Sequence, residues 1–251
     1  MSKTQNYKLT IAYHGARYCG WQRQPDQISI QETIETTLTR MWGGTDRITI
    51  HSAGRTDTGV HALGQVAHFT APAKFRERGI LRNALNANLP DDIRILQAIR
   101  VPADFHSRFS AVGKTYHYQL FCREMHDPME LGRSWQMRRQ LNLAMMREAA
   151  EHFLGRHDFA SFASNPGYER ENTVRTIHNI RFVKQGPRIT LKFHGDGFLY
   201  RMVRNLTGAI VRAGDGRLTP AEIHTILTAR NRSSAPPPAP AHGLYLVKVF
   251  Y

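Results

Sequence analysis

The order of strands and helices expected over the first hundred residues constrains the fold more than any other feature of this sequence. Residues 7–13 alternate between apolar and polar side chains and predict a strand, and Ser29 with Glu32 three positions later predicts the start of a helix. Further strands are expected over residues 48–51, 65–70 and 93–101, and a second helix over residues 75–86. This order is typical of a ferredoxin-like or RRM-like unit, whose antiparallel sheet leaves one face open for binding RNA.

The second half of the chain repeats the α/β pattern after a break at residues 102–106. The pattern predicts strands over residues 115–121, 176–184, 188–194 and 244–251, and helices over residues 141–153, 198–213 and 219–230. The proline-rich residues 235–240 predict a stiff connector that places the last strand. We therefore expect an α/β (α+β) protein of two RRM-like subdomains, residues 1–105 and 106–251.

A polar loop with several glycines joins the strands expected at residues 48–51 and 65–70. It contains Arg55 and Asp57, and Gly54 and Gly59 relax the backbone so that both side chains can point to one place. A nearby arginine would keep Asp57 ionised, as a carboxylate nucleophile requires. The same residue types are also compatible with a simple Asx-type turn that carries a surface ion pair.

Residues 54–62 read Gly-Arg-Thr-Asp-Thr-Gly-Val-His-Ala, and this motif resembles the signature of the tRNA pseudouridine synthase A family. Segments that resemble other blocks of the family follow in the family's order, at residues 18–24, 86–90, 109–118, 198–208 and 243–246. The resemblance covers nearly the whole chain from about residue 7. Thr58 departs from the motif, which more often has alanine there, but it leaves Arg55, Thr56 and Asp57 in register.

The resemblance implies a catalytic cleft between the two subdomains, whose sheets would be antiparallel, and four site residues. Asp57 would be the catalytic nucleophile, and Tyr116 would stack on a flipped uracil and take part in moving the C5 proton. Arg204 matches the family's basic partner for the aspartate, and Arg55 would either pair with Asp57 or fill the space left by the extruded nucleotide. Taken alone, Tyr116 could be a core aromatic on a strand and Arg204 a solvated arginine on a helix.

The resemblance also implies the substrate and the assembly. The substrate would be tRNA, with uridines at positions 38, 39 and 40 of the anticodon stem-loop isomerised, and the family acts as a homodimer. The reaction leaves net composition unchanged, so no redox cofactor is expected. Two rival interpretations remain: a noncatalytic RNA-binding protein of two RRM-like units, and a pseudouridine synthase that acts on another RNA.

Charge supports a polyanionic partner. The 251 residues contain 34 Lys and Arg against 20 Asp and Glu, a net charge of +14. Residues that could contact phosphate are Arg23, Arg76, Arg78, Arg108, Arg175 and Lys192. Cys19 and Cys122 are far apart and read as free thiols, and the sequence shows neither a signal peptide nor a membrane span. A cytoplasmic protein is therefore expected.

Metal and glycosidase chemistry are not expected. His61 and His68 lie seven residues apart with no third ligand in the pattern, and the His-x-Glu with Pro-Cys-x-x-Cys of zinc deaminases is missing from the sequence. A retaining glycosidase needs a second carboxylate about 5 Å from the first, and the motif around Asp57 offers none.

Overall fold

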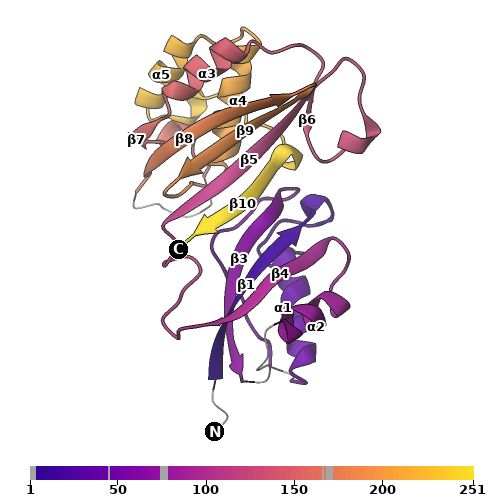
Figure 1. Ribbon diagram of the computed structural model, residues 1–251. Coiled ribbons are helices and arrows are strands. Elements are labelled where there is room, and N and C mark those ends of the chain that lie inside the picture. The colour runs from indigo at the N-terminus through magenta and orange to yellow at the C-terminus, as the bar shows by residue number, and fades with distance from the viewer. Residues whose placement is uncertain (1–3, 45, 74–78, 166, 168–171) are drawn as a thin grey trace. The chain divides into compact units, whose positions relative to one another are not determined.

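The computed structural model describes residues 4–44, 46–73, 79–165, 167 and 172–251. The chain forms two compact units, residues 1–112 together with 245–251, and residues 113–244 (Figure 1). Both units combine helices with a mostly antiparallel sheet, so the expected mixed α/β class is confirmed. In the described ranges, no helix has the length and the apolar character needed to cross a membrane.

The first unit has the expected order of elements. They are β1 (Thr4–Tyr13), α1 (Ile30–Met41), β2 (His51–Ser52), β3 (His61–Pro72), α2 (Ile80–Asn88) and β4 (Ile93–Val101). All of β10 (Leu244–Phe250) except its first residue also belongs to this unit. The strands pair antiparallel in the order β4, β1, β3, β2, as a ferredoxin-like unit requires. Helices α1 and α2 lie together on one face of this sheet (Figure 1).

Strand β10 adds to β3 in parallel. Tyr245 lies opposite His61, and Leu246 lies opposite Ala62. The sequence pattern predicts the strand but not this pairing. The structure thus groups residues 245–251 with the first unit, whereas the sequence-based division at residue 105 places them in the second.

The described residues of the second unit form a sheet and three α-helices. Its elements are β5 (Gly113–Cys122), β6 (Trp135–Met137), α3 (Leu143–Glu151), β7 (Gly155–Asp158), β8 (Val174–Gln185), β9 (Arg188–Gly195), α4 (Met202–Gly214) and α5 (Pro220–Thr228). β9 pairs antiparallel with β5 and β8, β8 pairs antiparallel with β7, and β6 runs parallel to β5. The helices lie on one face of the sheet (Figure 1), where Tyr118, Leu191 and Phe193 are fully buried.

Short 3-10 helices connect several of these elements. They lie at Gly15–Arg17, Pro128–Glu130, Ala160–Phe162, Arg232–Ser234 and Ala241–Gly243. The sequence pattern predicts none of them, and it also misses the short strands β6 and β7. Elements of three or four residues contain too few side chains to display a period.

Local capping signals place two helices correctly. The Ser29 side chain accepts a hydrogen bond from the backbone N–H of Glu32 at 3.2 Å, which is worth about 1 kcal/mol. Glu32 does not complete the box, because its carboxylate pairs with Arg23 at 3.3 Å instead. At α5 both halves of the capping box form between Thr219 and Glu222, with proline at the first helical turn.

The expected strand over residues 48–51 is wrong for most of its length, because β2 contains only His51 and Ser52. Side chains of α1 satisfy the backbone that a ladder would use. The Ile50 N–H donates to Glu35 Oε1 at 3.0 Å, and the Ile48 N–H donates to Thr39 Oγ1 at 3.0 Å. Those donors are therefore not available for strand pairing.

Two helices begin later than the pattern predicts. α4 begins at Met202 rather than at Phe198, because Arg201 has a left-handed backbone with φ of 58° and cannot continue a helix. α2 begins at Ile80 after Gly79, and most of the segment expected to begin it, residues 75–78, lies outside the described residues.

Candidate active site and RNA-binding face

The motif loop joins β2 to β3 in the first unit and is closed at both ends by backbone hydrogen bonds. At its start the Ala53 N–H donates to the Val66 carbonyl at 2.8 Å. At its end a tight turn forms, in which the Val60 N–H donates to the Asp57 carbonyl at 3.1 Å and Gly59 supplies a φ of 78°. Asp57 therefore stands at the first position of a turn, which fixes its backbone.

A layer of residues under the loop holds Thr56. The Tyr13 hydroxyl and Thr56 Oγ1 share a hydrogen bond of 2.8 Å, and the Trp21 N–H donates to the Thr56 carbonyl at 3.0 Å. At Gly20 a Cβ atom would lie only 2.5 Å from that carbonyl oxygen, so only glycine allows the two backbones to come this close. Gln65 Nε2 donates to the Gly54 carbonyl at 2.8 Å from below.

Burial alternates along the loop. Thr56 is buried, Asp57 on one side of it is half-buried, and Arg55 on the other side is exposed. Among the described residues Arg55 makes no hydrogen bond or ion pair. The loop thus turns its threonine into the unit and leaves the arginine in solvent.

The first residue of β3 supports the same loop from the C-terminal side. His61 is buried, and its Nδ1 accepts a hydrogen bond from the Gly15 N–H at 3.0 Å. Its ring stacks on Tyr245 of β10 with centroids 4.7 Å apart. His61 is therefore a structural residue that ties β3 to β10 and to the loop after β1.

Tyr116 lies on β5 of the second unit, on the face that the helices cover. It is 8% exposed and stands opposite Phe193 in the ladder with β9. Its ring meets that of Phe198 edge to face, with centroids 5.2 Å apart. Phe198 belongs to the segment 198–201 that precedes α4. Two of the segments that resemble family blocks, residues 109–118 and 198–208, therefore contact each other at Tyr116.

Arg204 lies in the first turn of α4, half-buried, and the proline-rich connector holds it. Its Nε donates to the Ala239 carbonyl at 2.8 Å, and its own carbonyl accepts from the Ala239 N–H at 2.9 Å. Burial raises the pKa of the nearby Tyr118 phenol, and the Arg204 charge opposes that rise. Arg204 is therefore fixed by backbone contacts rather than free on a helix surface.

The structure thus places the four candidate site residues in two pairs. Arg55 and Asp57 share one loop of the first unit, while Tyr116 and Arg204 lie in the second. Their joint action on one nucleotide stays a prediction. Sequence reasoning missed Tyr13 and Gln65 under the loop, and it included Gly20 only as part of the family-like segment 18–24, without a role.

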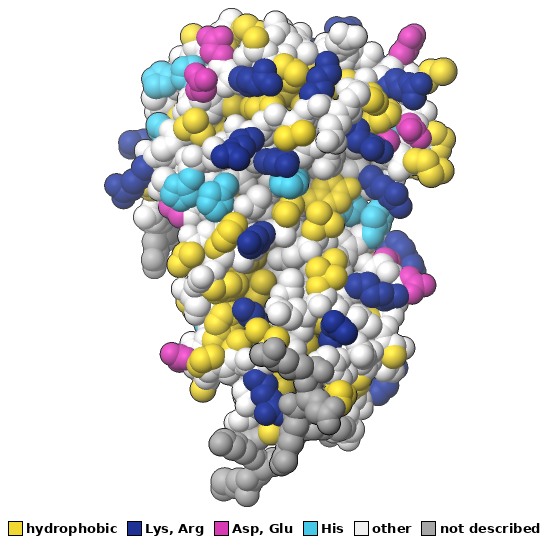
Figure 2. All heavy atoms as spheres, in the orientation of Figure 1, with side chains coloured by type: hydrophobic (Ala, Val, Ile, Leu, Met, Phe, Trp, Pro, Cys, Tyr) yellow, Lys and Arg dark blue, Asp and Glu magenta, His cyan; other side chains and the backbone are white. Residues whose placement is uncertain are grey.

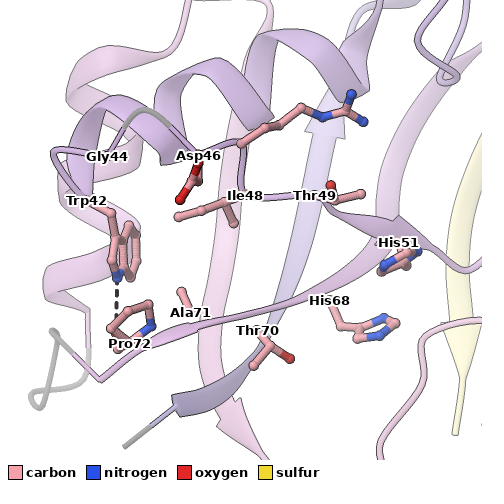
Figure 3. Close-up of a pocket in the computed structure, with 11 residues that line it drawn as sticks. Trp42, Gly44, Asp46, Ile48, Thr49, His51, His68, Thr70, Ala71 and Pro72 are labelled. Atoms are coloured by element: carbon pink, nitrogen blue, oxygen red, sulfur yellow. Dashed lines mark hydrogen bonds between the residues drawn. The ribbon is translucent and has the colours of Figure 1, made fainter. Parts of the chain in front are cut away.

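A groove of about 570 Å³ lies beside the β2–β3 pair of the first unit (Figure 3). Its lining residues include Trp42, Arg47, His51, His68 and Pro72, and none of the four candidate site residues. Arg47 pairs with the buried carboxylate of Glu35 at 2.8 Å, and the Trp42 Nε1–H donates to the Pro72 carbonyl at 3.0 Å. Much of its polar lining is thus engaged in holding the unit together.

Several histidines lie together in the first unit. In the part of the chain that the structure describes, no group of three or more His, Cys, Asp or Glu side chains could hold a metal ion. His68 packs against His51 and His106, with ring centroids 5.2 and 4.5 Å away, and shares a 2.9 Å hydrogen bond with the Ser107 hydroxyl. This cluster is a packing contact between β2, β3 and the segment that follows β4.

The sheet of the second unit presents a basic face. β5, β8 and β9 contain no Asp or Glu. On the side opposite the helices His117, Lys192 and Arg181 stand in one cross-strand row, since Lys192 pairs with both of the others. Figure 2 shows Lys, Arg and His side chains gathered over these strands. An open, acid-free sheet face of this kind suits a phosphate backbone.

The other phosphate candidates differ in their surroundings. Arg23 is paired with Glu32, the Arg108 guanidinium lies over the Phe109 ring, and Arg175 donates to the Val174 carbonyl. Arg76 and Arg78 lie outside the described residues. Of the six, Lys192 is the one in the basic row.

A family model described as tRNA pseudouridine synthase matches residues 9–110 and 149–251. The chain belongs to this family. Among solved structures, a chain of a Cbf5–Nop10–Gar1 complex aligns over 81% of this chain and 53% of that chain, at 11% identity and a TM-score of 0.33, which is too weak to support an argument.

Three relatives share one more specific name, tRNA pseudouridine synthase A. The protein of Methylacidiphilum infernorum is 46% identical over 245 residues, 98% of this chain and 95% of the relative. That of Chlamydia trachomatis serovar A is 44% identical over 250 residues, 99% and 92% of the two chains. That of Geotalea daltonii is 41% identical over 248 residues, 98% and 100% of the two chains.

Proposed function

We propose that this chain isomerises uridine to pseudouridine at positions 38, 39 and 40 in the anticodon stem-loop of tRNA. In the reaction the N1–C1′ bond breaks, the uracil turns, and a C5–C1′ bond forms. A proton leaves C5 and N1 gains one, so atoms balance without a redox partner. The task needs a carboxylate, a route for one proton and a pocket that retains the freed base.

We assign one role to each candidate residue. Asp57 is the carboxylate that works at C1′ of the target nucleotide. Tyr116 stacks on the uracil and its hydroxyl serves the C5 proton, while Arg204 is the cation that keeps Asp57 ionised. Arg55, which is exposed and has no partner among the described residues, fills the space of the extruded nucleotide.

The anchored loop carries this proposal. A surface turn with an ion pair would need neither a buried threonine nor a glycine that lets a second backbone approach within contact distance. Here the residue before Asp57 is held by its hydroxyl and by its carbonyl, in a chain of the tRNA pseudouridine synthase family. Such fixation suits a carboxylate that must meet one carbon atom.

The wider assembly also belongs to the proposal. The basic row on β5, β8 and β9 supports a tRNA partner, because neutralised phosphates release counterions. We further propose a homodimer, a cytoplasmic location suited to two free thiols, and a reaction without cofactor. Sedimentation of the purified protein with and without tRNA tests the dimer.

The deciding experiment is to incubate the purified protein with an unmodified tRNA transcript and to map pseudouridine by position. We expect pseudouridine at positions 38, 39 and 40 of this transcript. We expect none in a control transcript with cytidine at those positions. Binding without any pseudouridine would support the noncatalytic alternative. Pseudouridine formed only in ribosomal RNA fragments added in parallel would support a synthase for another RNA.

A further inference from the structure

We propose that Tyr13 is a positioning residue for Asp57, acting through the hydroxyl of Thr56. This inference rests on the proposed function, because it takes Asp57 to be the reacting carboxylate. Tyr13 is the last residue of β1, more than forty positions before the loop, and no motif in the sequence marks it. Its side chain is 5% exposed, and it contacts the loop at Thr56 from the interior of the first unit.

The contact fixes the residue that precedes Asp57. Tyr13 Oη and Thr56 Oγ1 are 2.8 Å apart, and the Thr56 carbonyl accepts the Trp21 N–H at 3.0 Å. The side chain and the carbonyl of Thr56 are thus both held. Because the Thr56 carbonyl belongs to the peptide that joins Thr56 to Asp57, a rotation there would swing the Asp57 carboxylate.

A buried amide extends the contact to the other end of the loop. Gln65 is fully buried, donates to the Gly54 carbonyl at 2.8 Å and accepts from the Val66 N–H at 3.1 Å. Burial raises the pKa of the Tyr13 phenol, and hydrogen bonds with Thr56 and Gln65 oppose part of that rise. Tyr13 at Thr56 and Gln65 at Gly54 therefore form a buried polar network that holds the loop at two points.

Such a network has two distinguishable effects. Any buried hydrogen bond adds stability, so its loss alone says nothing about catalysis. A shift of about 1 Å in a reacting group, however, can lower the rate about 10²-fold without weakening substrate binding. A positioning role therefore predicts a fall in kcat at constant KM, whereas a purely structural role predicts lower stability alone.

The same strand supplies a matched control. Tyr7 lies six residues before Tyr13 on the buried face of β1, is 2% exposed, and stacks on Phe69 with centroids 5.1 Å apart. Its hydroxyl is buried and has no hydrogen-bond partner in the described part of the chain. Tyr7→Phe thus removes a buried hydroxyl from the same strand without touching the loop.

The experiment compares full-length variants by single-turnover and steady-state pseudouridine formation, by tRNA binding and by Tm. We expect Tyr13→Phe and Thr56→Val each to lower kcat about tenfold or more while KM and the Kd for tRNA stay within about twofold of wild type. The double variant should lose no more than the worse single variant. Thr56→Ser, which keeps the hydroxyl, should restore most of kcat, and Tyr7→Phe should leave kcat unchanged.

Two outcomes overturn the inference. One is a Tyr13→Phe variant that keeps wild-type kcat, and the other is a loss of kcat that Tyr7→Phe shows equally at a similar change in Tm. The Asp57→Asn variant distinguishes a failure of the positioning role of Tyr13 from a failure of the proposed function. If Asp57→Asn stays active, the proposed function is wrong; if it is inactive while Tyr13→Phe is normal, only the positioning role is wrong.

Discussion

At the scale of single residues, Asp57 is the side chain whose removal should matter most. Asp57→Asn keeps shape and removes charge, so we expect pseudouridine formation to fall by about 10³-fold or more with tRNA affinity within about threefold of wild type. Asp104→Asn, at an exposed carboxylate of the same unit, is the control and should behave as wild type. Equal loss of binding and activity on Asp57→Asn would instead make the residue structural.

His68 should make the stability of the protein depend on pH. Burial, together with His106 and His51, lowers its pKa to about 4 from the ordinary 6.5. The unfolded chain therefore binds a proton between pH 6.5 and 4 that the folded chain refuses, so this contribution is complete above about pH 6.5 and is lost as pH falls towards 4. The loss should reach at most about 3 kcal/mol.

Urea unfolding at pH 7 and at pH 4.5 measures this effect. His68→Gln, which can still accept from the Ser107 N–H, should flatten the difference between the two conditions. The pKa of His106 is lowered with the same sign, first by its own burial, so part of the slope should remain in that variant. An unchanged slope in His68→Gln would assign the dependence to other groups.

At the scale of elements, the close approach of the segment after β1 to the motif loop can be tested with two glycines. Gly20 has φ of 98° and an added Cβ would lie 2.5 Å from the Thr56 carbonyl oxygen; Gly43 has φ of 67° and nothing within 4 Å. Gly20→Ala should cost about 2 kcal/mol more than Gly43→Ala and should also lower kcat. Equal Tm and equal activity of the two variants would contradict this close packing.

The basic row on β5, β8 and β9 should act on binding rather than on chemistry. Arg181→Glu and Lys192→Glu should each weaken tRNA binding about tenfold and reduce the salt slope by about one, with single-turnover rate at saturation unchanged. Lys184→Glu makes the same charge change on β8, but its side chain points to the other face because it pairs with the buried Ile189. That control should bind normally; three equal effects would indicate net charge alone.

Elements whose signals are local could be predicted from the sequence. Ser29 and Thr219 predict where their helices begin, because an N-cap contacts a residue only three positions later in the sequence. The sequence wrongly predicts a strand over residues 48–51, since the contacts of Glu35 and Thr39 that prevent strand pairing come from another element. In the same way the motif identifies Asp57, but Tyr13 contacts the loop from a distant part of the sequence, which no local pattern can indicate.

At the scale of the whole molecule, net charge sets how binding responds to salt. With +14 and an acid-free sheet face, tRNA affinity should fall on the order of 10²-fold between roughly 50 and 200 mM salt if four or more phosphates are neutralised. The measurement is a plot of log Kd against log salt concentration for wild type. A flat plot would remove phosphate contacts as the main source of affinity.

The return of β10 to β3 has a consequence for how the protein is made. A ribosome releases residues 113–244 before residues 245–251, although the latter belong with residues 1–112. Until that strand emerges, His61 lacks the tyrosine on which its ring stacks, and the start of β3 at His61 and Ala62 lacks its neighbour on one edge. A nascent chain stalled before residue 245 should therefore hold an unfinished first unit that attracts chaperones, and the motif loop should reach its final packing only after residues 245–251 have left the ribosome.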